Sequence, residues 1–278
     1  DDLLDLRARV KFLAQIACVG LMALPGEILV WNLGAIGPGG PVILTSWAVP
    51  VTIIGVVGMI NAFNMIDGLD GLAGTVSVIG LVWFAAAAAL LGVRAELLLA
   101  MLMVFCILGF LMFNLRHRWR SRASVFLGDA GSMMLGAILA FLAIRLSQRT
   151  GPTLSPIAAL WICALPIIET VSLAFRRLVA GQSPFTADRQ HLHYLLLDSG
   201  VTVSQVVAVL AAVTFLLGGV GVGGWYVGAS DLVLLLGLAI PAACHTWFSL
   251  YGWRQLPRLL PGGSATEERL GRAQPLLK

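Results

Sequence analysis

The chain has 278 residues, of which 59% are hydrophobic and only 12% are charged, and its mean hydropathy is +0.92. Soluble domains carry roughly 25% charged residues, so this composition excludes a soluble globular protein and indicates an integral membrane protein. The formal net charge of +4 is modest, and nucleic acid is not expected as a partner. The four cysteines lie singly in apolar runs, which predicts neither a disulfide framework nor a zinc site.

Eight apolar segments approach the ~20 residues with which a helix crosses a bilayer. They cover residues 9–24, 46–66, 72–93, 97–115, 125–146, 155–175, 205–222 and 232–250. A helix satisfies its own backbone hydrogen bonds within the lipid, so helix is the form expected of all eight. The sequence therefore predicts an all-α integral membrane protein with one polytopic domain over residues 1–252. The polar tail over residues 253–278 is expected to be cytoplasmic and poorly ordered.

The segment from residue 27 to residue 45 interrupts this helical pattern. Glycines and prolines between residues 34 and 41 separate two short β-prone runs, residues 28–31 and 42–45. This composition predicts a short β-hairpin-like segment on the external face of the membrane.

Eight spans place both termini on one side of the membrane, and the basic residues then sort between the two faces. Three of them, Arg94, Arg145 and Arg149, fall on the side away from the termini. The other lysines and arginines fall on the side of the termini. Because cytoplasmic loops carry an excess of Lys and Arg, both termini are predicted to be cytoplasmic.

The second span ends in a polar stretch, Asn61-Ala-Phe-Asn-Met-Ile-Asp-Gly-Leu-Asp-Gly71. Asn61, Asn64, Asp67 and Asp70 recur at three-residue spacing, so neighbouring pairs share a helix face, and the two Asp-Gly steps let the helix end. An ordinary turn between helices would explain one Asp and one Gly. An ionised side chain near hydrocarbon costs roughly 2.5 to 3.5 kcal/mol, so the second acid indicates a function such as holding a cation or a phosphate.

Most of the acidic side chains fall on the predicted cytoplasmic side. They are Asp1, Asp2, Asp5, Asp67, Asp70, Asp129, Asp188 and Asp198. Clustered carboxylates raise one another's pKa unless a divalent cation neutralises them, and oxygen ligands favour Mg²⁺ or Mn²⁺. The sequence therefore predicts an acidic Mg²⁺ site at the inner interface, with Mn²⁺ as an alternative metal.

Two loops on the same side are basic or rich in glycine. Asn114 ends the fourth span, and the run from Arg116 to Arg122 suits either an anchor to the inner leaflet or a contact with a polyanion. The run Phe126-Leu-Gly-Asp-Ala-Gly-Ser132 places Asp129 among glycines at a helix start, which favours phosphate binding.

A third loop contains Asp188-Arg-Gln-His-Leu-His193. Two histidines without a cysteine partner are a weak zinc signal. Beside Asp188 and Arg189, His191 and His193 are instead expected to contact a diphosphate or a sugar. His245 lies inside an apolar span and is left outside the predicted site.

In these motifs the chain resembles the polyprenyl-phosphate N-acetylhexosamine-1-phosphate transferases. It is most similar to the bacterial branch that moves GlcNAc-1-phosphate from UDP-GlcNAc to undecaprenyl phosphate. The resemblance covers residue 1 to about residue 207. It rests on Asp1-Asp2-Leu-Leu-Asp5, on the Asn61 to Gly71 and Phe126 to Ser132 runs, and on Ser183-Pro-Phe with Asp188 to His193.

The resemblance implies catalytic roles for Asp1, Asp2, Asp67, Asp70 and Asp129, with Asp129 and Asp67 at the metal. Together with the patterns above, it implies substrate contacts for Asn61, Asn64, Asn114, Arg116, Asp188, Arg189, His191 and His193. The implied reaction is attack by undecaprenyl phosphate on the phosphate that bears the sugar, releasing UMP and initiating cell-envelope polysaccharide synthesis. The enzyme would lie in the bacterial inner membrane with its site facing the cytoplasm, and a homodimer is compatible with the sequence.

The chain departs from the family pattern at three places. The family has membrane spans before the Asp-Asp motif, so an N-terminal truncation is expected here. Tyr194 stands where another His is usual, and Glu169 stands where an Asp is more usual.

Other functions and mechanisms remain open at this point. One alternative is the related transferase that uses UDP-muramyl-pentapeptide, and others are a membrane carrier or a non-catalytic scaffold. Carriers place their acids near the bilayer midplane, whereas these acids lie at the ends of spans. Direct attack by the lipid phosphate and a two-step route through an aspartyl intermediate both fit the sequence.

Overall fold

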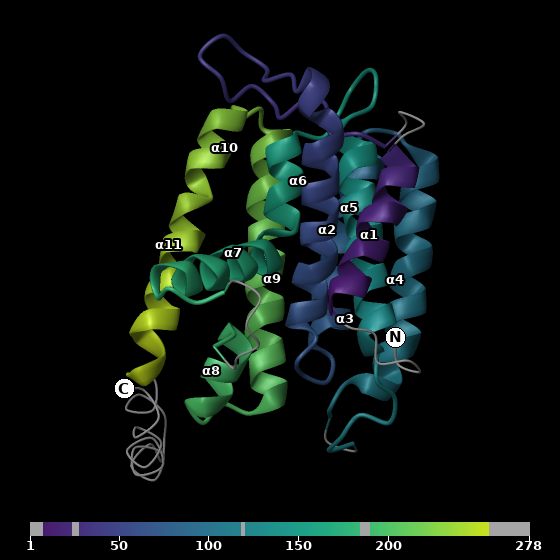
Figure 1. Cartoon of the computed structure of the whole chain (residues 1–278). Coiled ribbons are helices and arrows are strands. Elements are labelled where there is room, and N and C mark those ends of the chain that lie inside the picture. Colours follow the sequence, from purple (N-terminus) through teal and green to yellow (C-terminus); the bar gives the residue numbers. More distant parts are fainter. Residues whose placement is uncertain (1–7, 24–27, 118–119, 184–189, 256–278) are drawn as a thin grey trace.

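The computed structural model describes residues 8–23, 28–117, 120–183 and 190–255, and within these ranges its regular secondary structure is helical, without a β-strand (Figure 1). The α-helices are α1 (Ala8–Ala23), α2 (Ala48–Ile66), α3 (Leu72–Leu90), α4 (Arg94–Asn114), α5 (Gly128–Ser147), α6 (Pro156–Ile162), α7 (Ala164–Val179), α8 (Leu192–Asp198), α9 (Val203–Tyr226), α10 (Asp231–Gly237) and α11 (Ala239–Leu250). Two short 3-10 helices, η1 (Thr45–Trp47) and η2 (Gly252–Arg254), precede α2 and follow α11. The all-α prediction is confirmed for these residues.

Six helical spans in the described ranges are long and apolar enough to cross a membrane. They are α2 with η1, α3, α4, α5, α9 and the α10–α11 pair, and the bent pair α6–α7 gives a seventh if it counts as one span. The remaining predicted span, residues 9–24, corresponds to α1, which is a shorter apolar helix. The chain is therefore a multi-pass membrane protein, and the number of eight spans stays a prediction.

The predicted span over residues 155–175 is broken rather than continuous. The axes of α6 and α7 differ by 83°, and Cys163 between them is not helical. Pro166 explains the break, because its ring clashes with the carbonyl four residues earlier, that of Ile162, and it has no N–H to donate there. As a result α7 runs across the bundle instead of along it (Figure 1).

In residues 28–45 isolated antiparallel bridges join Asn32 to Ile43 and Gly37 to Gly40, and the external β-hairpin stays a prediction. The Gln148 side chain at the end of α5 accepts the Asn32 N–H at 3.0 Å and donates to the Asn32 carbonyl oxygen at 2.9 Å. Thr52 Oγ1 on α2 accepts the Val30 N–H at 2.8 Å. These contacts fasten the segment to the end of the bundle opposite α8 (Figure 1).

A close approach of α2 and α5 sets the geometry of the polar residues beyond it. A Cβ at Gly136 would lie 2.8 Å from both the Ile60 Cα and the Met59 carbonyl oxygen, so only glycine lets the two backbones meet. The helices are antiparallel, so one turn from this point toward α8 the chain reaches Asn64 on α2 and Ser132 on α5. Glycine packing therefore brings these two polar side chains together.

We expect Gly136→Ala to lower the unfolding midpoint in detergent, because the added methyl group collides with backbone rather than with a movable side chain. Overpacking of this kind costs about 1–3 kcal/mol. Gly109→Ala on α4 is the matched control, since a Cβ there has no neighbour within 4 Å in the described structure. Circular dichroism measures the unfolding midpoint of each variant. Equal midpoints for Gly136→Ala and Gly109→Ala would contradict the packing argument.

Candidate active site

The turn between α2 and α3 carries Asp67 and Asp70 to one end of the bundle. Asp67 directly follows the last residue of α2, and Gly71, which precedes α3, has a φ of +84°. A side chain is strained in this left-handed conformation, so glycine lets the chain reverse directly after Asp70. The Asp-Gly steps in the sequence therefore do form the end of a helix.

Asn114, at the end of α4, holds this turn in place. Its Oδ1 accepts the Gly71 N–H at 2.6 Å, and its Nδ2 donates to the Val125 carbonyl oxygen at 2.7 Å. The side chain is buried, with 5% of its surface exposed. In the structure Asn114 therefore connects the α2–α3 turn to the segment before α5, and substrate contact stays a prediction for it.

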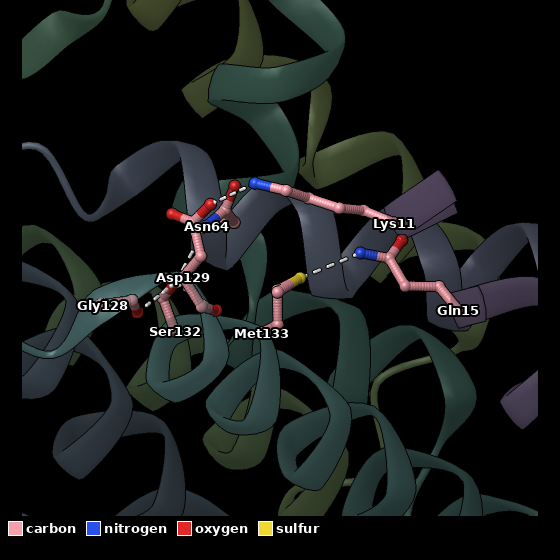
Figure 2. A network of polar contacts seen from close by, with 7 residues as sticks. All are labelled: Lys11, Gln15, Asn64, Gly128, Asp129, Ser132 and Met133. Atoms are coloured by element: carbon pink, nitrogen blue, oxygen red, sulfur yellow. Dashed lines mark hydrogen bonds and ion pairs between the residues drawn. The ribbon is translucent and has the colours of Figure 1, made fainter. Parts of the chain in front are cut away.

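Asp129, on the first turn of α5, contacts side chains from α1 and α2 (Figure 2). Lys11 Nζ on α1 donates to its Oδ2 at 2.7 Å, and Asn64 Nδ2 on α2 donates to its Oδ1 at 3.1 Å. The same Asn64 amide lies 3.0 Å from Ser132 Oγ. The Asp129 side chain keeps 41% of its surface exposed, so it remains accessible to a ligand.

A second pair of side chains extends this layer toward the lipid core. Asn61 Nδ2 donates to Gln15 Oε1 at 2.7 Å. Figure 2 shows the next contact, in which Gln15 Nε2 lies 3.1 Å from Met133 Sδ. Asn61 thus joins α2 to α1 in the structure. Its predicted role in binding substrate is untested.

The carboxylates of the α2–α3 turn are in different electrostatic environments. Asp70 Oδ2 accepts from Arg116 Nε at 2.6 Å and from the Ala123 N–H at 3.2 Å. Burial, together with the charges of Asp129 and Asp70, raises the pKa of Asp67 from 3.8 to about 6. The structure thus places Asp67 close enough to both other carboxylates for their charges to act on it.

The two predicted histidines meet a buried acid. Glu169 Oε1 on α7 lies 3.2 Å from His191 Nδ1 and 3.7 Å from His193 Nδ1. His191 caps α8 in an extended conformation, and its ring stacks on that of His193 with centroids 5.4 Å apart. Both rings therefore face Glu169, although His191 has an extended backbone and His193 lies in the first turn of α8.

His193 also reaches the turn that carries the aspartates. Its side chain is fully buried, and a Cβ at Gly68 would lie 2.3 Å from its Nε2. Burial lowers the pKa of His193 to about 4, since it outweighs the nearby charge of Glu169, which raises the pKa, and His191 adds to the lowering; the ring is therefore neutral near pH 7. A ring in this position packs against the turn, and direct contact with a sugar stays a prediction.

Sequence reasoning missed three residues of this arrangement. Lys11 and Gln15 form a polar pair four residues apart in the first apolar segment, which was the available signal. Glu169 had been noted as a departure from a family pattern, although an acid in an apolar span is itself a functional signal. The predicted residues Asp1, Asp2, Asp188 and Arg189 lie outside the described residues.

An apolar cavity of about 410 Å³ opens beside Asp129, between α1, α2 and α5. Lys11 and Gln15 are its polar lining residues near the carboxylate, and Thr52 is a polar residue nearer the opposite end. Most of the remaining wall is hydrophobic, including Val19, Val56 and Phe141. The cavity thus combines a charged end with a lipid-like interior.

Oxygen atoms dominate the groups around the exposed end of this cavity. Within the described ranges no three His, Cys, Asp or Glu side chains are already arranged as a metal-binding group. Asp67 and Asp129 repel each other, and Asn64 adds a carboxamide beside Asp129. Such a donor set suits a hard divalent cation and does not suit zinc.

Comparison with known proteins connects this geometry with a family. Residues 1–147, more than half of the chain, match the family model described as Glycosyl transferase family 4. An undecaprenyl-phosphate alpha-N-acetylglucosaminyl 1-phosphate transferase of Salmonella typhi is 34% identical over 229 residues, which cover 81% of this chain and 61% of that protein.

The proteins of the same name from two further organisms are also similar. That of Escherichia coli (strain K12) is 34% identical over 225 residues, covering 80% of this chain and 60% of the relative. That of Haemophilus influenzae is 31% identical over 152 residues, covering 55% of this chain and 43% of the relative. The chain thus spans about three fifths of the length of the first two relatives. The matched region contains the aspartate turn and Asp129, and the chain belongs to glycosyl transferase family 4.

Proposed function

We propose that this protein transfers N-acetylglucosamine-1-phosphate, or a similar N-acetylhexosamine-1-phosphate, from a UDP-sugar to undecaprenyl phosphate. The products are UMP and a lipid-linked diphosphate sugar, with which cell-envelope polysaccharide synthesis begins. The observation that carries the proposal is that Lys11, which lines an apolar cavity, pairs with Asp129, whose charge also acts on Asp67. The names of the relatives supply the acceptor and the group transferred.

The cavity suits the acceptor, because undecaprenyl phosphate has one anionic end and a long apolar chain. The hydrophobic wall would take the first isoprenyl units, and Lys11 at the charged end would pair with the phosphate. The remainder of the chain would lie in the bilayer. An apolar wall beside the reacting phosphates would also limit their access to water.

The end of the bundle that carries Asp67 and Asp129 would face the cytoplasm of a bacterial cell, in the inner membrane. Lys11, Arg116 and Arg176 belong to the basic residues expected on that side, and cytoplasmic excess of Lys and Arg is the general rule. With eight spans both termini lie on that side, and the segment over residues 28–45 faces outward.

Mg²⁺, or Mn²⁺, fits the donor set described above, and Asp129 and Asp67 would hold it. When bound it would neutralise charge on the donor diphosphate. Neutralising the repulsion among the carboxylates would also bring the pKa of Asp67 down toward its ordinary value. Asp70 stays paired with Arg116, so it would shape the turn rather than compete for the cation.

The side chains would then orient the two phosphates for an in-line displacement. Lys11 would hold the acceptor, while Asn64 keeps the Asp129 carboxylate in position. A phosphate monoester is already largely ionised near pH 7, since its second pKa is about 6. We therefore favour direct attack by the acceptor oxygen on the sugar-bearing phosphorus, with UMP as the leaving group and no covalent enzyme intermediate.

We expect Lys11→Gln to raise the KM for undecaprenyl phosphate about tenfold, because a charge-assisted contact contributes roughly 1.5 to 3 kcal/mol. The KM for the UDP-sugar should change little. Lys11→Arg keeps the positive charge, so its KM for undecaprenyl phosphate should lie between those of wild type and Lys11→Gln. An unchanged acceptor KM in Lys11→Gln would show that this side chain does not bind the lipid phosphate.

The direct test is release of UMP by the purified chain in detergent, with Mg²⁺ or with EDTA, and with or without undecaprenyl phosphate. UDP-GlcNAc, UDP-GalNAc and UDP-muramyl-pentapeptide are offered separately, and the Escherichia coli relative serves as the positive control. We expect UMP only when acceptor, Mg²⁺ and an N-acetylhexosamine donor are all present.

Each other outcome rejects part of the proposal. Release from the pentapeptide donor alone would indicate the related peptidoglycan transferase. No release from any donor, either by this chain or by a version that carries the expected N-terminal spans, while the relative is active, would favour a carrier or a scaffold. Labelling of cysteines at positions 67, 70 and 129 from the outside of the cell would also contradict a cytoplasmic active site.

A further inference from the structure

Glu169 links the broken helix to the histidine segment. Its Oε1 accepts the Leu192 N–H at 2.9 Å and lies 3.2 Å from His191 Nδ1. Only 3% of the residue is exposed. The contacts join α7 to the start of α8, which are separated by a connecting segment of the chain.

The link continues to the aspartate turn through His193. The His193 Nδ1 lies 3.7 Å from Glu169 Oε1, while its Nε2 is so close to Gly68 that a Cβ there would sit 2.3 Å away. Gly68 directly follows Asp67 and precedes Asp70 by two residues. A shift of Glu169 would therefore be passed through a rigid imidazole ring to the two carboxylates.

Stability alone does not account for an acid at this position. Glu169 Oε2 and both ring nitrogens of His193 are buried without a hydrogen-bond partner in the described structure. An unsatisfied buried polar group costs about 1–3 kcal/mol, so these unpaired atoms offset part of what the contacts of Glu169 Oε1 contribute. Groups that are costly to bury are typical of sites where function determines the residue.

We propose that Glu169 is a positioning residue for the transfer reaction, holding the aspartate turn in its reactive geometry through His193 and Gly68. This inference rests on the proposed function. Glu169 itself does not touch the reacting phosphates. The 83° bend between α6 and α7 matters for this role, because it turns α7 across the bundle and brings Glu169 to the turn.

The first experiment compares Glu169→Gln with Glu169→Asp in the UMP assay. We expect the Gln variant to lose about 10- to 100-fold in kcat, as groups that orient metal ligands typically do, with little change in the donor KM. The Asp variant keeps a carboxylate on a shorter side chain and should recover part of the activity. Glu96→Gln is the matched control, since Glu96 is equally buried but pairs with Arg145 3.0 Å away, far from the site.

The unfolding midpoint separates positioning from a general structural role. A positioning role predicts a normal midpoint and a lower kcat for Glu169→Gln, with both normal in the control. Activity near wild type in Glu169→Gln would overturn the inference, and so would losses that merely follow a lowered midpoint. Absence of UMP release by the wild-type protein would instead reject the proposed function, so the two failures are distinguishable.

The second experiment tests the contact between His193 and Gly68. Gly68→Ala adds a methyl group against the ring and should lower kcat strongly, whereas His193→Ala makes room for it. We therefore expect Gly68→Ala to cost about tenfold less in the His193→Ala background than in wild type, since residues in contact are not additive. Equal losses in the two backgrounds would show that the ring does not position the turn.

Discussion

Asp129→Asn is expected to lower kcat/KM for transfer by about 100- to 1,000-fold, the usual loss when one group that stabilises charge in a transition state is removed. Asp129 is the proposed ligand with the most accessible carboxylate, and the variant takes one negative charge from the cation site. Adding excess Mg²⁺ should not restore the activity. The measurement is the initial rate of UMP release at several Mg²⁺ concentrations.

Asp231→Asn provides the control for this variant. Asp231 also lies on the first turn of a helix, but at the other end of the bundle, where it accepts the Ala35 N–H at 2.7 Å. The same change of charge should leave transfer close to the wild-type rate there. Full activity of Asp129→Asn, or equal losses in both variants, would refute the assignment of Asp129 as a ligand.

Asp67→Asn is expected to lower transfer to a similar degree while making the metal-free protein more stable. Burial and two neighbouring carboxylates raise the pKa of Asp67 to about 6, so the folded state binds this proton more tightly than the unfolded chain. The group's contribution to stability is complete below its ordinary pKa of 3.8 and is lost as the pH rises through about 6. Removing this charge by Asp67→Asn therefore stabilises the metal-free protein above about pH 6.

The stability effect is measured as the unfolding midpoint in EDTA at several pH values. The unfolding midpoint of Asp67→Asn should lie above that of wild type near pH 7.5, and the difference between the two midpoints should vanish as the medium becomes acidic. Asp70→Asn should not show this gain, because Asp70 already pairs with Arg116 at 2.6 Å. A wild-type midpoint above that of Asp67→Asn in EDTA at pH 7.5 would contradict the clustering of charges.

The positions of Asp67 and Asp129 also favour an enzyme over a carrier. In a carrier the acids lie near the middle of the membrane, whereas Asp67 follows α2 and Asp129 begins α5. Lys11, on α1, closes this end of the apolar cavity. This arrangement supports the proposal that one amphipathic substrate and one polar substrate meet at the membrane surface.

The sequence was sufficient for the membrane class and for the meeting of distant motifs at one end of the bundle. The length of each apolar segment predicts where a helix crosses the membrane. Two spans, α3 and α4, lie between Asp67 and α5, so α5 begins at the end of the bundle where Asp67 lies. The position of Asn64 and Asp129 at the same end of the bundle followed from this number of spans, whereas their contact is seen only in the structure. Its closeness depends on Gly136, whose role is visible only once α2 and α5 are packed.

The contacts that give the site its chemistry required the tertiary structure. Lys11 meets Asp129 across 118 positions of sequence, and the hydropathy of α1 alone cannot indicate which neighbour its cation faces. Glu169 reaches His191 only because the chain bends at Cys163, and the apolar composition of residues 155–175 had favoured a single straight helix. Hydrophobic length determines which segments enter the membrane. Side-chain volume and the bend at a proline determine which polar groups meet there, because both act only when the helices touch.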